Sequence, residues 1–270
     1  MTSAIILDKS FLQGTKTRRI QELAAAHRLV VSDALFYELL TAPEQGRTRC
    51  FAKFPQTENP VDLVSHIGTM MRIEIDTHLP SGRPSEHREN LRFQFNPNLV
   101  SSSYVLPDQA QVAVEEQTTQ LQSDVVAFLE QVSLVPTFFP NLLTGNTAEQ
   151  KLAHAKAEGA LAKPRALIPF YSRLEPPPGE RPLPPARLVS EKWAVYRWLQ
   201  VKLLFAVDVY VRYRGALPET LSPSTYERME HDVLDAQVFM LGCLEGAFAT
   251  REKKLKRWWS LLCPDAPLYE

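Results

Sequence analysis

The feature that most constrains the fold is an apolar run at the start of the chain that ends abruptly in an acid. Residues Ala4 to Leu7 are all apolar, and Asp8 follows them directly. A continuous apolar run of this length is typical of a strand buried on both faces of a parallel sheet. Open α/β sheets bind their ligands at the carboxyl ends of the strands. The pattern therefore predicts an α/β protein in which Asp8 lies at a ligand-binding edge.

The next residues continue the alternation of helix and strand. The spacing of apolar residues predicts a helix over 15–27 and a second short strand over 29–31. Ser32 or Asp33 is placed to cap the helix that follows, which carries Glu38 as the lone acid of its middle. Glu38 considered alone is equally well explained as a solvated helix acid.

The end of the chain gathers further acids. A helix is expected to begin at Ser222-Pro223, because serine caps helices and proline suits their first position. Asp232 and Asp235 share one face of that helix, and a short strand after it leads into a polar turn that ends at Glu252. Crowded carboxylates raise one another's pKa unless a cation neutralises them. Three acids in one small space therefore favour a bound metal ion.

Three stretches of the sequence resemble the PIN-domain nucleases. Two of them are Ile5-Ile6-Leu7-Asp8-Lys9-Ser10-Phe11-Leu12 and Val30-Val31-Ser32-Asp33-Ala34-Leu35-Phe36-Tyr37-Glu38-Leu39-Leu40. The third resembles the family's closing motif, in which a helix-borne aspartate (Asp235) precedes a strand that ends in a Thr-x-Asp turn (Thr250-Arg251-Glu252). The chain departs from the pattern in having a glutamate at 252, where aspartate is commoner, and in the long gap between Glu38 and Asp232.

The resemblance implies a three-layer α/β sandwich around a central, mainly parallel sheet. Its core would consist of residues 1–55 and 220–270, and residues 56–219 would form a mostly helical insertion. Within the insertion, apolar spacing predicts helices at 60–77, 109–135, 146–161 and 188–214, and polar residues predict a loop at 79–92. The proline-rich connector 164–185 is expected to be extended, because proline interrupts regular helices.

The resemblance also implies a divalent-metal site. Mg²⁺ and Mn²⁺ take hard oxygen ligands, keep several waters and bind through few direct carboxylates. The candidate metal ligands and catalytic residues are Asp8, Glu38, Asp235 and Glu252, and the supporting residues are Asp232, Thr250 and Ser10. A metal ion there would activate water for hydrolysis of phosphodiester bonds in RNA or single-stranded nucleic acid. The alternatives without metal binding are that Asp8 only ends its strand and that Glu252 forms a surface ion pair with Lys256.

Basic residues near the acids are candidates for phosphate contacts. They are Lys16, Arg18 and Arg19 in the first long helix, and Arg251, Lys253 and Lys254 after the final strand. Trp258 and Trp259 follow, and an exposed aromatic ring can stack on a base. A basic run is more often a solvated helix face, however, and paired tryptophans more often pack in a core. The net charge of −1 means that nucleic-acid binding needs such a local patch.

Other classes of protein are disfavoured by what the sequence lacks. The three cysteines form no CxxC pair, which indicates reduced thiols in a cytoplasmic protein. The first residues do not match a signal peptide, and no apolar run is long enough to span a membrane. The histidines have no zinc-binding spacing, and no glycine-rich phosphate loop occurs.

The resemblance leaves the biological role open. PIN proteins act as toxins of toxin–antitoxin pairs, as defence effectors or as RNA-processing enzymes. The expected partners are RNA or single-stranded nucleic acid, an inhibitory or regulatory protein, and a second copy of the chain in a homodimer. The alternative from another class is a non-catalytic PIN-like scaffold that binds nucleic acid or a protein through the helical insertion, and the glutamate at 252 favours it.

Overall fold

The computed structural model describes residues 3–57, 59–88, 97–101, 103–174, 176, 181–217 and 221–270. These residues form a sheet of five strands, all parallel, in the order β3-β2-β1-β4-β5. The strands are β1 (Ala4–Leu7), β2 (Arg28–Ser32), β3 (Asp62–Val64), β4 (Phe248–Ala249) and β5 (Leu268–Tyr269). The predictions of an α/β fold and of a buried parallel strand before Asp8 are confirmed.

The first strand lies at the centre of the sheet. All four residues of β1 are buried, as the unbroken apolar run predicts. Its neighbours are β2 from the start of the chain and β4 from the end, with Leu7 in register with Ala249. Because the strands are parallel, their carboxyl ends share one edge, and the residues after Leu7 and Ala249 meet there.

Helices from both ends of the chain surround this sheet. They are α1 (Lys9–Gly14), α2 (Thr17–Ala26), α3 (Asp33–Thr41), α4 (Glu44–Phe51) and α5 (Ile67–Thr77) from the first part, and α10 (Pro223–Glu245) and α11 (Lys253–Leu262) from the last. The predicted start of α10 is confirmed, since the Ser222 hydroxyl accepts a hydrogen bond from the Thr225 amide. The predicted helix at 15–27 corresponds to α2.

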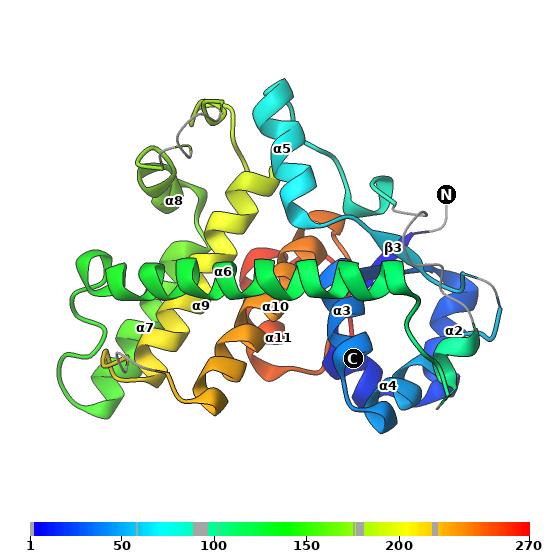
Figure 1. Ribbon diagram of the computed structural model, residues 1–270. Helices are drawn as coiled ribbons and strands as arrows, with labels where there is room; N and C mark the ends of the chain where they lie inside the picture. Colours follow the sequence, from blue (N-terminus) through cyan, green and yellow to red (C-terminus); the bar gives the residue numbers. More distant parts are fainter. Residues whose placement is uncertain are drawn as a thin grey trace.

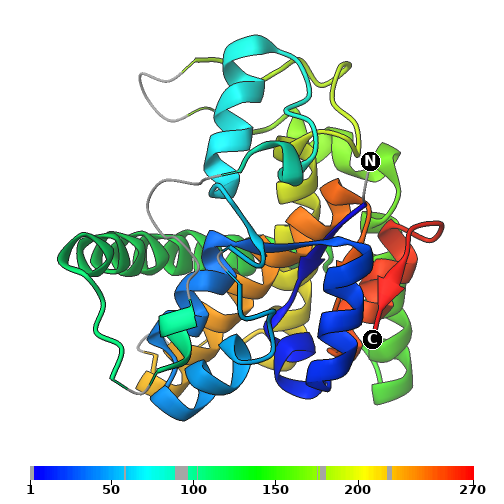
Figure 2. The ribbon, with the colours of Figure 1, turned by 90° about the vertical axis from the view of Figure 1, so that its right-hand side faces the viewer.

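The middle of the chain is mostly helical, as expected. It contains α6 (Asp108–Phe138), α7 (Thr147–Leu161), α8 (Pro164–Tyr171) and α9 (Ala194–Arg212), with short 3₁₀ helices η1 (Pro84–Glu86) and η2 (Pro97–Val100). Figures 1 and 2 show α6 lying across one side of the molecule, with α9 and α10 behind it in the view of Figure 1. The middle segment packs directly on helices of the sheet region.

Two predictions for this middle segment are wrong in detail. The range 60–77 is a strand followed by a helix, because Asp62–Val64 pairs with β2 and supplies the third strand of the sheet. The range 164–185 is not extended throughout, because α8 begins at Pro164, where the missing amide costs nothing, and continues through Pro169. Residues 175 and 177–180 of that connector, and residues 89–92 of the predicted loop, lie outside the described residues.

The predicted helix at 188–214 begins later than expected, at Ala194. The buried carboxylate of Glu74 in α5 accepts hydrogen bonds from the amides of Ala194 (2.6 Å) and Val195 (2.9 Å). These amides belong to the first turn of α9, which has no partners within the helix. A contact with a residue 120 positions away in sequence thus accompanies this helix start, and apolar spacing alone could not reveal it.

The tryptophans after the basic run belong to the core. Trp258 is fully buried and Trp259 is 2% exposed. Both pack against Phe239, while Trp258 also contacts Phe205 and Trp259 stacks on Phe248 of β4. The core interpretation of this pair is confirmed, and stacking of these rings on a nucleic-acid base is ruled out by their burial. No helix in the described ranges is long and apolar enough to cross a membrane.

Candidate active site at the carboxyl edge of the sheet

Asp8 sits at the end of the central strand and is almost completely buried, with 2% of its surface exposed. The Thr250 hydroxyl donates a hydrogen bond of 2.7 Å to Asp8 Oδ2, and the Ser10 hydroxyl donates to the same oxygen. The Arg251 amide donates to Ser10 Oγ at 3.0 Å, and the Glu252 amide donates to Thr250 Oγ1 at 3.1 Å. The first turn of α1, which begins directly after Asp8, and the turn that follows β4 are therefore held together around one carboxylate.

Asp235 of α10 faces the same place. Burial raises the pKa of Asp235 well above its usual value, and the negative charges of Glu252 and Asp8 raise it further, while Lys254 opposes them. Burial also raises the pKa of Asp8, against the lowering effect of its two hydroxyl donors. Asp235 has no hydrogen-bond or ion-pair partner among the described residues, so its charge is costly in this position.

Glu38 lies beside these acids but has partners of its own. Its Oε1 accepts hydrogen bonds from Lys9 Nζ at 2.8 Å and from His231 Nδ1 at 2.9 Å. Burial alone would raise the pKa of Glu38, but the hydrogen bonds from His231 and Lys9 outweigh it and lower the pKa. Glu38 is therefore a stable anion that neighbouring cations neutralise.

Sequence analysis missed the roles of Lys9 and His231. Lys9 directly follows Asp8, and His231 precedes Asp235 by one helical turn. Residues four apart on a helix share a face, so the spacing puts His231 on the same side of the helix as Asp235. The signal was present in the spacing, although nothing local identified Glu38 as the partner of these two side chains.

Asp232 does not join the cluster around Asp8. Its carboxylate binds Arg212 of α9 at 2.8 Å and Lys254 of α11 at 3.0 Å, and it is 4% exposed. The residue thus connects three helices. Lys254 also lies 3.5 Å from Glu252, which is part-buried at the mouth of the site. The predicted pairing of Glu252 with Lys256 is not found, because the Lys256 ammonium group binds Glu270.

The predicted phosphate-contacting residues divide into exposed and sequestered groups. Lys16, Arg18, Arg19, Arg251 and Lys253 are exposed. The side chains of Arg18 and Arg19 approach Glu22, and Arg251 donates to the Gly14 carbonyl, which holds it between the first helices and the 250–252 turn. Lys254 is mostly buried, lies over the rings of Phe205 and Trp258 and is bound to Asp232, so it is committed to the fold.

Carboxylate oxygens that remain for a cation are few. In the part of the chain that the structure describes, no group of three or more His, Cys, Asp or Glu side chains is arranged to hold a metal ion together. Both hydrogen bonds to Asp8 fall on Oδ2 and both to Glu38 fall on Oε1. Asp8 Oδ1 and the Asp235 carboxylate are hard oxygen donors, and Mg²⁺ often uses only one or two direct carboxylates. The donor types at this edge therefore fit such an ion.

No family model matches the chain, and comparisons with characterised proteins and with solved structures give no match either. The functional argument therefore depends on the fold and on the chemistry of this edge.

Proposed function

We propose that the protein is a PIN-like, divalent-metal-dependent nuclease that hydrolyses phosphodiester bonds of RNA or single-stranded nucleic acid. The observation that carries the proposal is the Asp235 carboxylate. It comes from the end of the chain, lies near Asp8 from the start, and carries a pKa raised by burial and by two neighbouring acids. A fold retains such a destabilising arrangement when the site has a use for it.

The roles of the acids follow from their partners. The carboxylates of Asp8 and Asp235 would hold Mg²⁺ or Mn²⁺ directly, with Ser10 and Thr250 fixing the orientation of Asp8. Glu252, whose charge acts on Asp235, would lie beside the ion. When bound, such a cation supplies Lewis-acid charge that activates water and offsets charge developing on the phosphoryl oxygens. Glu38 is held by Lys9 and His231, which suits it to a place beside the ion rather than to direct ligation through Oε1.

Substrate contacts are assigned to the exposed cations near the edge. Lys16, Arg251 and Lys253 are exposed, and the Arg251 side chain bridges from the 250–252 turn to the end of α1. Phosphates attract such cations without regard to base sequence. Lys254 is removed from the predicted set, because its ammonium group is bound to Asp232. A role as a toxin, a defence effector or an RNA-processing enzyme is consistent with this activity.

The direct test is cleavage of labelled single-stranded RNA by the purified protein in Mn²⁺ or Mg²⁺, with single-stranded DNA and a chelator in parallel. We expect cleavage by wild type and a loss of about 100-fold or more in the variants Asp8→Asn and Asp235→Asn. Asp265→Asn, which removes an exposed acid near the C-terminus, should remain within about twofold of wild type. Cleavage that neither active-edge variant reduces would remove these residues from the mechanism.

One observation favours a second function, that of a non-catalytic PIN-like scaffold. The absence of a ready group of three or more metal-binding side chains among the described residues is what a site that has lost catalysis would show. Under this alternative, wild type would bind nucleic acid or a protein partner and would cleave nothing in any metal. Absence of cleavage together with measurable RNA binding would select the scaffold over the nuclease.

A further inference from the structure

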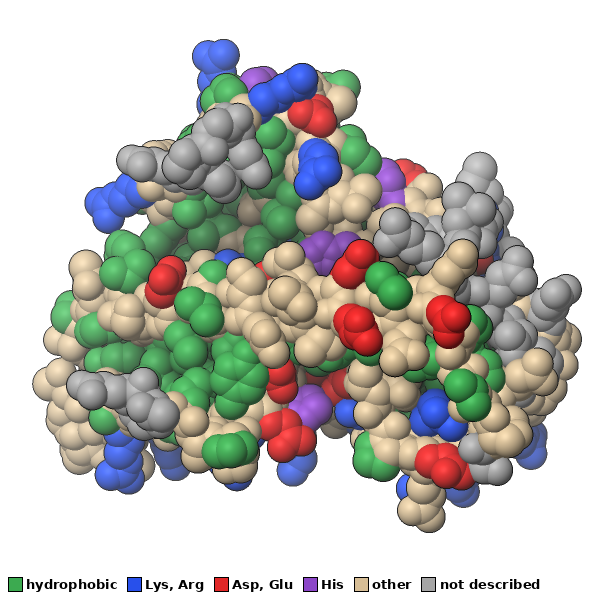
Figure 3. Space-filling view, in the orientation of Figure 1, with side chains coloured by type: hydrophobic (Ala, Val, Ile, Leu, Met, Phe, Trp, Pro, Cys, Tyr) green, Lys and Arg blue, Asp and Glu red, His purple; other side chains and the backbone are tan. Residues whose placement is uncertain are grey.

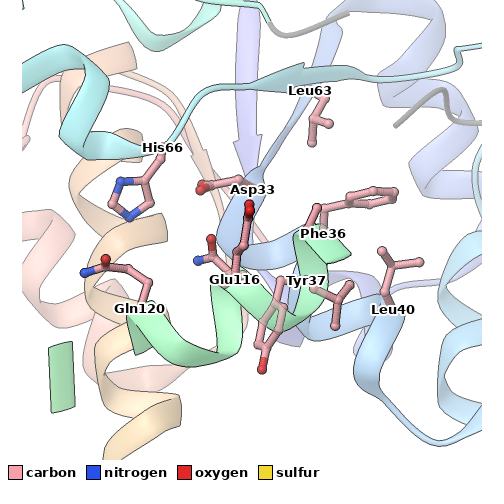
Figure 4. Close-up of a pocket in the computed structure, with 11 residues that line it drawn as sticks. Asp33, Phe36, Tyr37, Leu40, Leu63, His66, Glu116 and Gln120 are labelled. Carbon is pink, nitrogen blue, oxygen red and sulfur yellow. The ribbon is translucent and has the colours of Figure 1, made fainter. Parts of the chain in front are cut away.

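A cavity lies between α3 and the first half of α6. Its volume is about 310 Å³, within the range of small-molecule and side-chain pockets. Phe36, Leu40 and Leu63 provide apolar walls, and Asp33 and Glu116 provide carboxylates. Figure 4 shows these two carboxyl groups directed into the space between His66 and Phe36. The cavity therefore combines an apolar surface with negative charge.

The walls of this cavity are fixed relative to each other. The hydroxyl groups of Tyr37 in α3 and Thr118 in α6 lie 3.0 Å apart in a hydrogen bond. Glu38, the next residue after Tyr37, binds Lys9 and His231 at the acidic edge. The cavity and the candidate active site thus use different faces of α3. A ligand in the cavity would contact the helix that holds Glu38 without entering the cluster of acids.

His66 adds a hydrogen-bond donor to the cavity. Its Nδ1 accepts a hydrogen bond of 3.0 Å from the Gly68 amide, so in the neutral ring the proton resides on Nε2. Nε2 is buried and has no partner among the described residues. A buried donor without an acceptor is costly, and a ligand carbonyl would satisfy it. The cavity therefore presents both a donor and carboxylate acceptors to a ligand.

The helix that forms one wall of the cavity contains acidic residues and no basic ones. Over its 31 residues, α6 contains five acids and no lysine, arginine or histidine. It also exposes apolar side chains, with Val112 54%, Val126 57% and Leu134 51% exposed. In Figure 3, red and green atoms follow the helix, whereas most blue atoms lie above or below it. An acidic face with exposed apolar residues suits a partner that is basic and amphipathic.

We propose that this cavity and the outer face of α6 bind a basic peptide segment of a partner protein, with an arginine side chain in the cavity. The guanidinium group would pair with the carboxylates of Asp33 and Glu116 beside the Tyr37 ring. A peptide carbonyl would accept from His66 Nε2, which a lone cation could not do. The apolar residues of the segment would cover the exposed valines of α6.

A nucleic-acid base is the competing occupant, since bases have amino groups that carboxylates can bind. Its attached phosphates, however, would have to lie against a helix that carries five negative charges and no positive one. Phosphates in contact with the helix would lie closer to its carboxylates than the screening length, which is about 8 Å at physiological salt, and would therefore be repelled. The charge of α6 therefore favours a cationic peptide over a nucleic-acid strand at this surface.

The test measures anisotropy of a fluorescein-labelled amphipathic 12-residue peptide of arginine and leucine. A matched peptide with every arginine replaced by citrulline keeps the shape and removes the charge, and a single-stranded RNA 12-mer probes the alternative. We expect the citrulline peptide to bind about tenfold or more weakly than the arginine peptide. Glu116→Gln should weaken binding of the arginine peptide about fivefold.

Two further variants separate the cavity from general electrostatic attraction. Ala113→Leu fills the cavity without changing charge and should weaken the arginine peptide about tenfold. Glu130→Gln removes the same charge as Glu116→Gln from the same helix, about 21 Å away, and should change binding less than twofold. Circular dichroism and thermal unfolding establish that each variant folds.

The outcomes that overturn the proposal are specific. Peptide binding that Ala113→Leu leaves unchanged would show that the cavity is not used. Absence of arginine-peptide binding would also overturn the proposal. RNA binding that is tighter than peptide binding and that Ala113→Leu abolishes would assign the cavity to a base. None of these results depends on nuclease activity, so the proposal succeeds or fails separately from the proposed function.

Discussion

The buried carboxylate of Glu74 is fully hydrogen-bonded at a helix junction of the middle segment, whereas the carboxylate of Asp235 at the edge of the sheet has no partner among the described residues. Glu74 in α5 is fully buried and accepts four hydrogen bonds. Two come from Ser81, and the others come from the amides of Ala194 and Val195. Asp235 at the sheet edge accepts no hydrogen bond from the described residues, and burial together with the acids around it raises its pKa. The carboxylate of Glu74 thus has a full set of hydrogen-bond donors, and that of Asp235 has none among the described residues.

The comparison extends to two other buried acids outside the candidate site. Glu158 of α7 accepts hydrogen bonds from Trp258 at 2.7 Å and Arg257 at 2.6 Å. Glu245 of α10 accepts both from the amide and from the hydroxyl of Ser85. Acids that join elements of the fold therefore have donors. An acid that lacks donors stands out, and such a position identifies a functional site better than acidity or burial alone.

The largest change in the free energy of unfolding is expected at Glu74, whose carboxylate is fully hydrogen-bonded. Glu74→Ala leaves four buried donors without an acceptor, and we expect a loss of about 4 kcal/mol in the free energy of unfolding. Asp76→Ala on the same helix removes an exposed pair with Arg181 and should cost about 0.5 kcal/mol or less. Urea unfolding measures both. A small effect of Glu74→Ala would mean that satisfied buried acids do not stabilise this fold.

Glu158→Gln should cost less, about 2 kcal/mol, because the glutamine carbonyl can still accept from Trp258 while the charged bond to Arg257 is lost. The Arg257 side chain is half exposed, which limits the loss. Glu115→Gln on exposed α6 is the control and should be close to neutral. Equal costs for the two variants would contradict the role of Glu158 in joining α7 to α11.

Local patterns in the sequence predicted much of the fold and part of the site. The apolar run before Asp8, the cap at Ser222 and the apolar spacing of α6 and α7 each act over a few residues and were interpreted correctly. The short strand before the 250–252 turn was predicted and corresponds to β4. β3 and β5 were missed, because so short a segment becomes a strand through its neighbours and not through its own pattern.

Contacts between residues far apart in sequence explain the parts of the candidate site that the sequence did not predict. Asp8 could be named as a candidate because it directly follows an unbroken apolar run, and Asp235 because its stretch of sequence resembles the closing motif of the PIN-domain nucleases. The partners of Glu38, Asp232 and Lys254 could not be named, because each pair joins elements far apart in sequence. Asp232 has the same local pattern as Asp235, and only the positions of Arg212 and Lys254 show that Asp232 joins helices and that Asp235 has no such partner among the described residues.

Metal binding should offset the repulsion between the carboxylates of Asp235, Glu252 and Asp8 at the edge of the sheet. A ligand that binds only the folded state stabilises it by RT ln(1 + [L]/Kd), or about 1.4 kcal/mol at ten times Kd. We expect Mn²⁺ to raise the melting temperature of wild type, and not that of Asp235→Asn at the same concentration. Ca²⁺ and a chelator serve as comparisons. An equal rise in both proteins would place the metal elsewhere on the molecule.

The smallest expected effect has the opposite sign from that of Glu74→Ala and Glu158→Gln. Without metal, Asp235→Asn should stabilise the fold at pH 7 by about 1 kcal/mol, because it removes a charge crowded by Glu252 and Asp8. The folded pKa of Asp235 is raised, so the folded state holds its proton more tightly than the unfolded state. The stability due to that proton is complete below the unfolded pKa and is lost as pH rises through the folded pKa. The stabilisation by asparagine should therefore disappear near pH 3.8, the ordinary pKa of an aspartate, because Asp235 in the folded wild type is then protonated. Urea unfolding in a chelator at both pH values tests this, and destabilisation at pH 7 would show that Asp235 is a structural acid like Glu74.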